Sequence, residues 1–235
     1  MRMGQAIQRG RCSRPLSAAR PMFLLFVVFL NLIGSSGAWN GEVPRRPRGF
    51  PARAECGADV DMDIFIDPLC PDCKAAWPTV KRLLNVYSTE ELSIHIQLLP
   101  LPFHHYSYYA CQATVAAARL NSSAVFPWLQ TIFRYQDYFS TEATFAETTE
   151  SVLERLVGLA PHAGLDTKQF SSAFYDSEVD LDTRLAFKYS CSRGMMGTPS
   201  FLVNGVEAGS GDWSIKEWKE LLDPLMRRKG DSQYV

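Results

Sequence analysis

Two cysteines separated by two residues follow an apolar run in "FIDPLCPDCKAAWP", residues 65–78. A helix that starts here would place Cys70 at its N-terminus and Cys73 one turn further in. Unpaired backbone N–H groups and the helix dipole favour negative charge at that end, so they lower the pKa of the Cys70 thiol. Cys73 would lie close enough to attack a mixed disulfide on Cys70 and release the product. The spacing therefore predicts a redox-active dithiol.

The two residues between the cysteines influence the same helix end. Pro71 has no N–H to leave unpaired in the first turn. The Asp72 carboxylate suits the positive end of the helix dipole, but it opposes a thiolate by ~1 kcal/mol, under about one pKa unit. We therefore expect the pKa of Cys70 to lie near the upper, thioredoxin-like end of the ~3.5–7 range of such motifs.

A zinc half-site is the alternative use of the cysteine pair, and it requires two further ligands at matching spacing. The histidines are instead scattered along the chain, at positions 95, 104, 105 and 162. A purely structural Cys70–Cys73 bridge would close too small a loop to stabilise the fold much. The redox interpretation is therefore favoured, and it requires no metal and no cofactor.

The segments around the cysteine pair have the periodicities of an α/β protein. Residues 60–66 alternate as a strand does, residues 71–88 carry apolar residues at helical spacing, and residues 92–101 alternate again. This order is a βαβ unit, which predicts a parallel strand pair with a right-handed crossover.

From residue 104 to about residue 193 the apolar patterns are helical, so an all-helical insertion interrupts the sheet. A strand is expected to resume at Pro199–Gly205 and to turn back as a hairpin at Asn204-Gly205. A final helix would cover residues 214–229. Its predicted apolar face holds Ile215, Trp218, Leu221, Leu222 and Leu225. The predicted fold class is α/β, with a central mixed sheet flanked by helices and an all-helical insertion.

The amino end has the composition of a targeting segment. Residues 1–38 contain five arginines, no acidic residue, and an apolar block at 22–30 followed by "NLIGSSGA", with small residues at Ser36 and Ala38. This arrangement predicts a secretory signal peptide at 1–38, although Met22 could itself begin a shorter signal. An organelle transit peptide is the alternative, against which the dense apolar block argues. The block is shorter than the roughly 20 residues that span a bilayer, so no stable membrane span is expected after cleavage.

Cleavage would remove five of the 24 basic residues and none of the 25 acidic ones, which leaves a net charge of −6. This balance does not predict nucleic-acid binding. Residues 39–57 contain "PRRPRGFPAR" and are expected to form an extended Pro/Arg-rich linker. Residues 231–235 are expected to form a tail without an ER retrieval signal, so the ER lumen and the extracellular space both stay open as destinations.

Two separated motifs resemble the thioredoxin superfamily. "CPDCKAAWP" is similar to its active-site helix, including Pro78, a proline that kinks that helix. "GMMGTPSFLVNG", residues 194–205, resembles its cis-proline loop and following strand. The helical insertion, with "LPLPFHHYSYYACQATVAAARL" at its start, resembles the branch of the bacterial DsbA oxidoreductases. The resemblance implies a DsbA-like thioredoxin fold over residues 58–230, with the insertion at about 104–193.

By this resemblance Cys70 is the nucleophile and Cys73 the resolving thiol, and the two form a reversible disulfide. Pro199 would be cis and would act in catalysis by lying across the pair, while the Thr198 backbone would pair with an extended substrate. The implied substrate-binding residues are Pro71, Asp72, Thr198 and Pro199. The implied partners are protein or peptide thiols and disulfides, and a redox partner that recycles the pair. From the sequence alone, Pro199 could equally open a strand in the trans form.

The chain departs from the family six residues before Cys70, where many relatives carry a buried acid thought to help deprotonate the resolving thiol. That position is Ile64, flanked by Asp63 and Asp67. Either aspartate could substitute from a shifted place. Both are also candidates for solvent-facing strand ends, Asp67 in particular because a proline follows it.

Three cysteines lie outside the pair once Cys12 leaves with the signal peptide: Cys56, Cys111 and Cys191. They can form at most one bridge. We favour Cys111–Cys191, because both lie on predicted helices of the insertion, and Cys56 would then stay free near the linker. Three free thiols are the alternative, since free cysteine is among the most buried residue types.

The sequence "NSS" makes Asn121 a glycosylation acceptor between two predicted helices, and we expect a glycan there in a eukaryotic host. Met195 and Met196 are expected to fill the core, with an adaptable apolar patch for unfolded chains as the alternative. His104 and His105 could approach the cysteine pair from the insertion.

The leading hypothesis is a thiol–disulfide oxidoreductase of the secretory pathway that acts on protein cysteines through Cys70 and Cys73. Whether it is an oxidase, reductase or isomerase depends on redox poise and partners. One alternative is an enzyme similar to the kappa-class glutathione transferases, a branch that typically keeps a serine at the first cysteine position. The other is a non-catalytic, chaperone-like module that binds peptides in the groove beside Pro199.

Overall fold

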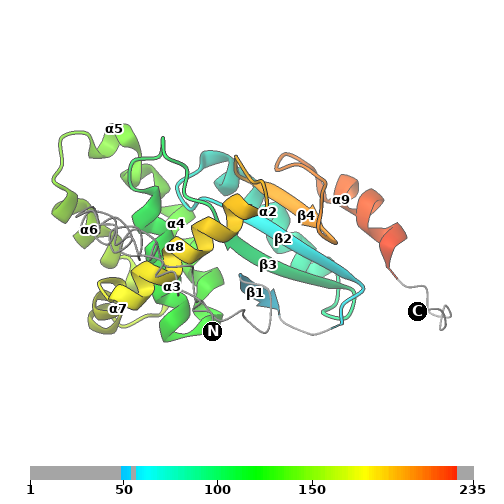
Figure 1. The fold of residues 1–235 in the computed structure, drawn as a ribbon, viewed down its shortest axis with the longest axis horizontal. Coiled ribbons are helices and arrows are strands. Elements are labelled where there is room, and N and C mark those ends of the chain that lie inside the picture. Colours follow the sequence, from blue (N-terminus) through cyan, green and yellow to red (C-terminus); the bar gives the residue numbers. More distant parts are fainter. Residues whose placement is uncertain (1–48, 54–56, 227–235) are drawn as a thin grey trace, which may run out of the picture. The chain divides into compact units, whose positions relative to one another are not determined.

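The computed structural model describes residues 49–53 and 57–226, so the predicted signal peptide and most of the predicted linker lie outside the described residues. A five-stranded sheet lies at the centre, in the order β1-β3-β2-β4-β5 (Figure 1). The strands are β1 Phe50–Arg53, β2 Val60–Ile66, β3 Leu92–Leu98, β4 Ser200–Val203 and β5 Val206–Glu207. β2 and β3 are parallel, and the other neighbouring strands are antiparallel. The predicted mixed sheet with a parallel central pair is confirmed.

The segment between β3 and β4 is helical, as predicted. The α-helices are α2 Pro71–Val86, α3 Ser107–Leu120, α4 Val125–Arg134, α5 Thr141–Thr144, α6 Thr149–Val157, α7 Thr167–Phe174, α8 Ser177–Ser192 and α9 Ile215–Leu222. Short 3-10 turns join them: η1 Ser122–Ala124, η2 Gln136–Phe139, η3 Ala160–Ala163 and η4 Asp223–Leu225. The hairpin turn at Asn204-Gly205 has positive φ at both residues, 49° and 79°, as a tight turn between β4 and β5 requires.

The sheet is covered on both faces because β2 is apolar at most positions. Met62 and Ile64 are fully buried in the main core, which also contains Trp77 of α2. Phe65 points to the opposite face and belongs to a smaller cluster, against which Tyr189 of α8 packs. α8 therefore lies across one face of the sheet, whereas α2 covers the other (Figure 1).

The helical insertion is attached to the sheet and to α2 by specific contacts. The Trp77 ring lies 5.0 Å from the Phe126 ring and 5.2 Å from the Phe133 ring, both on α4. At the end of α8, Ser190 Oγ donates a hydrogen bond to the Leu98 carbonyl of β3 at 2.8 Å. These contacts join the insertion to the middle of α2 and to the end of β3.

Four residues within the predicted linker form a strand. Residues 50–53 pair with β3 as the antiparallel edge strand β1, so the prediction of an extended linker through residue 57 is wrong at this point. The reason is that Phe50 and Ala52 pack against the main core. Their burial stabilises the segment in spite of its prolines and arginines.

The final helix is shorter than predicted. α9 ends at Leu222 and η4 follows, because Pro224 has no N–H to continue the helical hydrogen bonds. Trp218 and Leu222 are buried as expected, but Leu225 is 43% exposed and does not belong to the apolar face.

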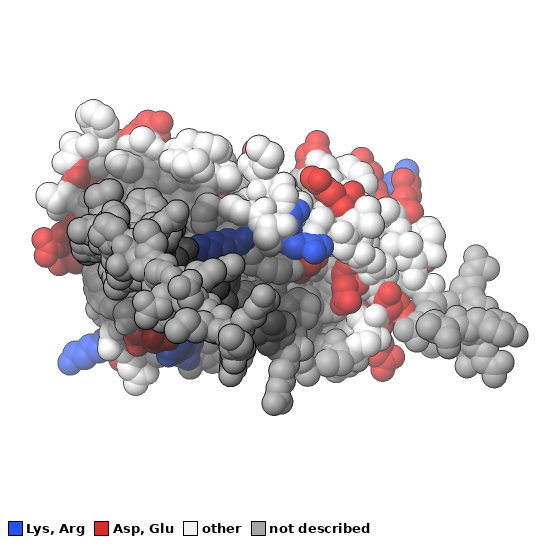
Figure 2. Space-filling view, in the orientation of Figure 1, with Lys and Arg blue, Asp and Glu red and all other residues white. Residues whose placement is uncertain are grey.

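The visible surface is mixed in charge. On the face drawn in Figure 2, red carboxylate side chains are more numerous than blue basic ones among the described residues. Within residues 49–53 and 57–226, no helix combines the length and the apolar content that a membrane crossing requires.

Candidate active site

Cys70 lies where β2 gives way to α2. Its N–H donates to the Asp67 carbonyl at 3.0 Å, which closes a tight turn, and Cys70 is the N-cap residue of the helix. Pro71 occupies the first helical turn. The backbone N–H groups of Asp72 and Cys73 in this turn lower the pKa of the Cys70 thiol, as expected for a cysteine at a helix N-terminus.

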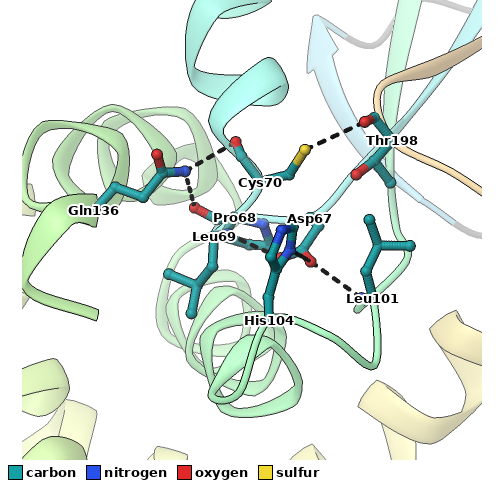
Figure 3. A network of polar contacts seen from close by, with 8 residues as sticks. All are labelled: Asp67, Pro68, Leu69, Cys70, Leu101, His104, Gln136 and Thr198. Carbon is teal, nitrogen blue, oxygen red and sulfur yellow. Dashed lines mark hydrogen bonds and ion pairs between the residues drawn. The ribbon is translucent and has the colours of Figure 1, made fainter. Parts of the chain in front are cut away.

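The loop before β4 lies against the same sulfur (Figure 3). The Thr198–Pro199 peptide bond is cis. The protonated Cys70 thiol donates a hydrogen bond to the Thr198 carbonyl oxygen at 3.2 Å, across 128 residues of sequence. The cis bond and the place of this loop beside Cys70 agree with the geometry that the resemblance implied, while the catalytic and substrate-binding roles stay predictions.

The two thiols of the pair have opposite pKa shifts. The pKa of Cys70 falls from 9.0 to about 6, chiefly because the Cys73 side chain donates a hydrogen bond to it, while burial opposes the change. Burial raises the pKa of Cys73 well above 9.0, and the neighbouring Cys70 adds to the rise. At neutral pH Cys70 is therefore mainly a thiolate, whereas Cys73 is a thiol. A value of about 6 lies nearer the upper end of the expected range.

Asp67 is fully buried, so the expectation that it faces solvent is wrong. One carboxylate oxygen, Oδ1, accepts the Leu69 N–H at 2.8 Å, and the other, Oδ2, accepts the Leu101 N–H at 3.0 Å. Oδ2 also lies 2.7 Å from His104 Nδ1 (Figure 3). The carboxylate points inward because it satisfies backbone N–H groups that would otherwise be buried without a partner.

His104 approaches the cysteine pair from the insertion, as expected. The hydrogen bond to Asp67 raises the pKa of His104 above 6.5, although burial opposes it. The negative charges of Cys70 and Asp72 raise the pKa of His104 further. The Asp67–His104 contact is therefore an ion pair when the imidazole is protonated, and it lies close to the thiolate. His105 is exposed instead.

Gln136 belongs to the same network but was not predicted. It is a buried residue of η2 whose Nε2 donates to the carbonyls of Pro68 at 3.0 Å and Cys70 at 2.9 Å (Figure 3). These bonds tie the turn before α2 to the insertion. The sequence offered one signal, a glutamine amid the aromatic residues of "FRYQDYF", and that pattern does not reveal its partners.

The family's buried acid is absent from its usual position, because Ile64 fills that place and is fully buried. Asp63 is turned to the other face of β2, where it accepts a hydrogen bond from Gln97 Nε2 at 2.9 Å. Asp67 is the carboxylate buried near the pair, and its backbone N–H lowers the pKa of Cys73 against the larger effect of burial. Of the two candidate aspartates, Asp67 is thus the one beside the resolving thiol.

A groove of about 320 Å³ opens beside Pro199. Its lining residues are Asp72, Ala75, Thr198, Pro199, Ser210, Gly211 and Asp212. Asp72, Thr198 and Pro199 were predicted as substrate-binding residues, and the structure brings them to one surface. The fourth predicted residue, Pro71, is exposed but is not part of the lining.

The favoured Cys111–Cys191 bridge is not formed in the structure, where both residues are free thiols. Cys111 is fully buried on α3, which raises its pKa well above 9.0, whereas Cys191 is exposed at the end of α8. The bridge is absent because the first side chain faces the core and the second faces solvent. Cys56 lies outside the described residues.

In the described part of the chain, His, Cys, Asp and Glu side chains do not gather in groups of three or more that could hold a metal ion.

The structure also places the predicted glycosylation site and the two methionines expected in the core. Asn121 is exposed and caps η1, where its Oδ1 accepts the Ser123 N–H at 3.0 Å. Its glycosylation stays a prediction. Met195 is buried as expected, but Met196 is 92% exposed, so the expectation of core filling is wrong for Met196.

The chain matches known proteins in family and in fold. Residues 55–224 match the thioredoxin family, whereas no curated protein matches the chain. Among solved structures, α-DsbA1 of Wolbachia pipientis is 15% identical with a TM-score of 0.61, over 78% of this chain and 93% of that chain. The thiol-disulfide exchange protein α-DsbA2 of the same organism is 18% identical with a TM-score of 0.59, over 75% and 87%. Pseudomonas aeruginosa DsbA2 is 17% identical with a TM-score of 0.56, over 78% and 100%. The chain therefore belongs to the thioredoxin family and has the DsbA-like fold, in which a helical insertion interrupts the sheet.

Proposed function

We propose that this protein is a thiol–disulfide oxidoreductase that exchanges disulfides with protein or peptide cysteines. The observation that carries the proposal is the Cys70 sulfur at the start of α2. Its pKa is lowered to about 6, and it lies 3.2 Å from the Thr198 carbonyl, next to a cis proline. A thiolate that exists at neutral pH is the attacking species in disulfide exchange. The name of α-DsbA2, a thiol-disulfide exchange protein, supports the same chemistry.

In the reducing direction, the Cys70 thiolate attacks one sulfur of a substrate disulfide. A Cys70–substrate bond forms, the substrate bond breaks, and the leaving sulfur takes up a proton. Cys73 then loses its proton and attacks Cys70, so that the Cys70–Cys73 bond forms and the second substrate thiol is released. Two electrons pass from the dithiol to the substrate. An oxidised pair runs the same steps in reverse, and a redox partner restores the starting state.

Deprotonation of Cys73 is the demanding step, because burial raises its pKa. Once Cys70 is held in a mixed disulfide, its negative charge is gone, and one cause of the raised pKa of Cys73 is removed. The Asp67 backbone N–H stabilises the Cys73 thiolate that results. Asp67 is thus a positioning residue that acts on Cys73 through its backbone and on His104 through its carboxylate.

The groove beside Pro199 would hold the polypeptide on either side of the substrate cysteine. Thr198 precedes the cis bond, and its backbone would pair with an extended segment. The compartment we propose is the secretory pathway or the extracellular space. The signal peptide predicted at 1–38 supports this, because disulfides form and persist in such oxidising surroundings.

The decisive test is Cys73→Ala expressed in a secretory host and separated on non-reducing gels. Without the resolving thiol, Cys70 should stay joined to its substrates, and the adducts should disappear on reduction. The control is the double variant Cys70→Ala, Cys73→Ala, which should form none. Cys191→Ala in the Cys73→Ala background removes an exposed thiol outside the site and should keep them. Adducts that depend on Cys191 instead, or full activity of Cys70→Ser, Cys73→Ser, would contradict the proposal and favour a peptide-binding module.

A further inference from the structure

The groove beside Pro199 carries carboxylates on two of its walls. Asp72 lies in the first turn of α2, and Asp212 lies in the loop between β5 and α9. Both residues are exposed. No lysine or arginine is among the described residues that line the groove. The surface that a substrate would meet next to Cys70 is therefore negatively charged.

The loop that carries Asp212 is held in place by two glycines. A methyl group at Gly211 would come within 2.5 Å of Pro199 Cγ, so the loop backbone packs directly on the proline ring. Gly209 has a φ of 86° and lies under the Trp218 ring, where a side chain has no room. The position of Asp212 relative to Pro199 thus follows from packing.

The groove carboxylates have no ion-pair partner within the described part of the chain, although the charge of Asp72 raises the pKa of His104. Asp72 and Asp212 form no ion pair there. Lys74, two residues after Asp72, instead pairs with Asp137 at 2.7 Å. Two exposed carboxylates that line one groove can therefore accept a cation from another chain.

We propose that this groove selects substrate segments with lysine or arginine next to the reacting cysteine, so that cationic peptides and proteins are the preferred clients. The inference rests on the proposed function, because the groove matters only when a substrate cysteine is bound at Cys70. An exposed ion pair changes binding by about fivefold at most. Two such pairs would give a preference of about tenfold, and salt would screen it.

The test uses three peptides that carry the same disulfide and differ only in the residues that flank it: arginine, glutamine or glutamate. The second-order rate constant for exchange with the reduced protein is measured at roughly 0.01 M and 1 M salt, where the Debye length falls from about 30 Å to 3 Å. We expect the order arginine, glutamine, glutamate at low salt, with about tenfold between the extremes. At high salt the three rates should converge.

The variant that tests the site is Asp212→Asn, which should lower the ratio of the arginine rate to the glutamate rate by about two- to fivefold. Glu150→Gln on α6 is the matched control, since it removes one exposed carboxylate outside the groove and should keep the ratio. Equal rates for all three peptides at low salt, or an equal loss of preference in Glu150→Gln, would overturn the inference and leave the proposed function intact. Absence of exchange with every peptide would overturn both.

Discussion

On the side of Cys70 that faces the helical insertion, the fully buried Asp67 carboxylate is hydrogen-bonded to His104, and Gln136 donates to the carbonyls of Pro68 and Cys70. On the groove side, Asp72 and Asp212 are exposed and form no ion pair with described residues. The insertion side fixes the geometry of the reactive turn, whereas in the proposed function the groove side would be completed by a substrate chain. The comparison predicts that stability and substrate choice depend on different residues around one sulfur.

The largest expected effect is on the insertion side. Asp67→Ala would leave the Leu69 and Leu101 N–H groups without an acceptor and remove the partner of His104. We expect the free energy of unfolding to fall by about 3–5 kcal/mol, measured by urea denaturation. Asp212→Ala on the groove side should change it by no more than about 0.5 kcal/mol. Equal losses in the two variants would remove the contrast between the sides.

Gly211→Ala tests a place where the groove side is tightly packed. The added methyl group would collide with the Pro199 ring, so we expect a loss of about 1–3 kcal/mol and slower disulfide exchange. Gly197→Ala is the matched control, because a methyl group there meets no atom within 4 Å. If both variants behaved alike in denaturation and exchange assays, the loop would not depend on contact with Pro199.

Gln136→Ala should cost about 1–2 kcal/mol, since the buried carbonyls of Pro68 and Cys70 lose the same donor. In a chain of this size, that corresponds to a melting temperature lower by roughly 2–8 °C. Without these bonds the turn before α2 should be held less firmly, and the hydrogen bonds that lower the pKa of Cys70 should weaken. The pKa of Cys70 should therefore move from about 6 toward 9.0. An unchanged melting temperature would mean that the contact does not contribute.

The smallest effect is a pH dependence. The pKa of His104 is higher in the folded state than in the unfolded state, where it is about 6.5. The ion pair with Asp67 therefore stabilises the fold fully when the pH is below the unfolded-state pKa. This stabilisation is lost as the pH rises through the folded-state pKa. His104→Gln should therefore be less stable than the parent by about 1 kcal/mol in acid and equal to it in alkali. Thiolate absorbance should also show a higher pKa for Cys70 in the variant, because a neighbouring positive charge is gone. A stability difference that is independent of pH would indicate a packing role alone.

The sequence predicted the groove side of the site better than the insertion side. Cys70, Asp72, Thr198 and Pro199 lie in two local motifs, and each motif resembles a family in which the two loops meet. Strand periodicity and the Asn204-Gly205 turn predicted most of the sheet for the same local reasons.

The insertion side depends on contacts between distant segments. Asp67 looked like a strand end because a proline follows it, and nothing local shows that the Leu101 N–H, 34 residues later, requires its carboxylate. Gln136 lies 66 residues from the Cys70 carbonyl that it binds. Phe50 likewise packs against the core only because residues 50–53 pair with β3, which is distant in the sequence. The local sequence is rich in prolines and arginines, so it predicts a linker.

The bonds from Gln136 to the turn before α2 bear on any attempt to miniaturise this protein. A shortened domain that keeps only the strands, α2 and α9 would retain both redox sulfurs. It would lose Gln136, whose amide donates to the Pro68 and Cys70 carbonyls, and His104, whose imidazole is hydrogen-bonded to Asp67. If the proposed function holds, excising the helical segment would leave both cysteines in place but remove contacts that hold the turn before α2.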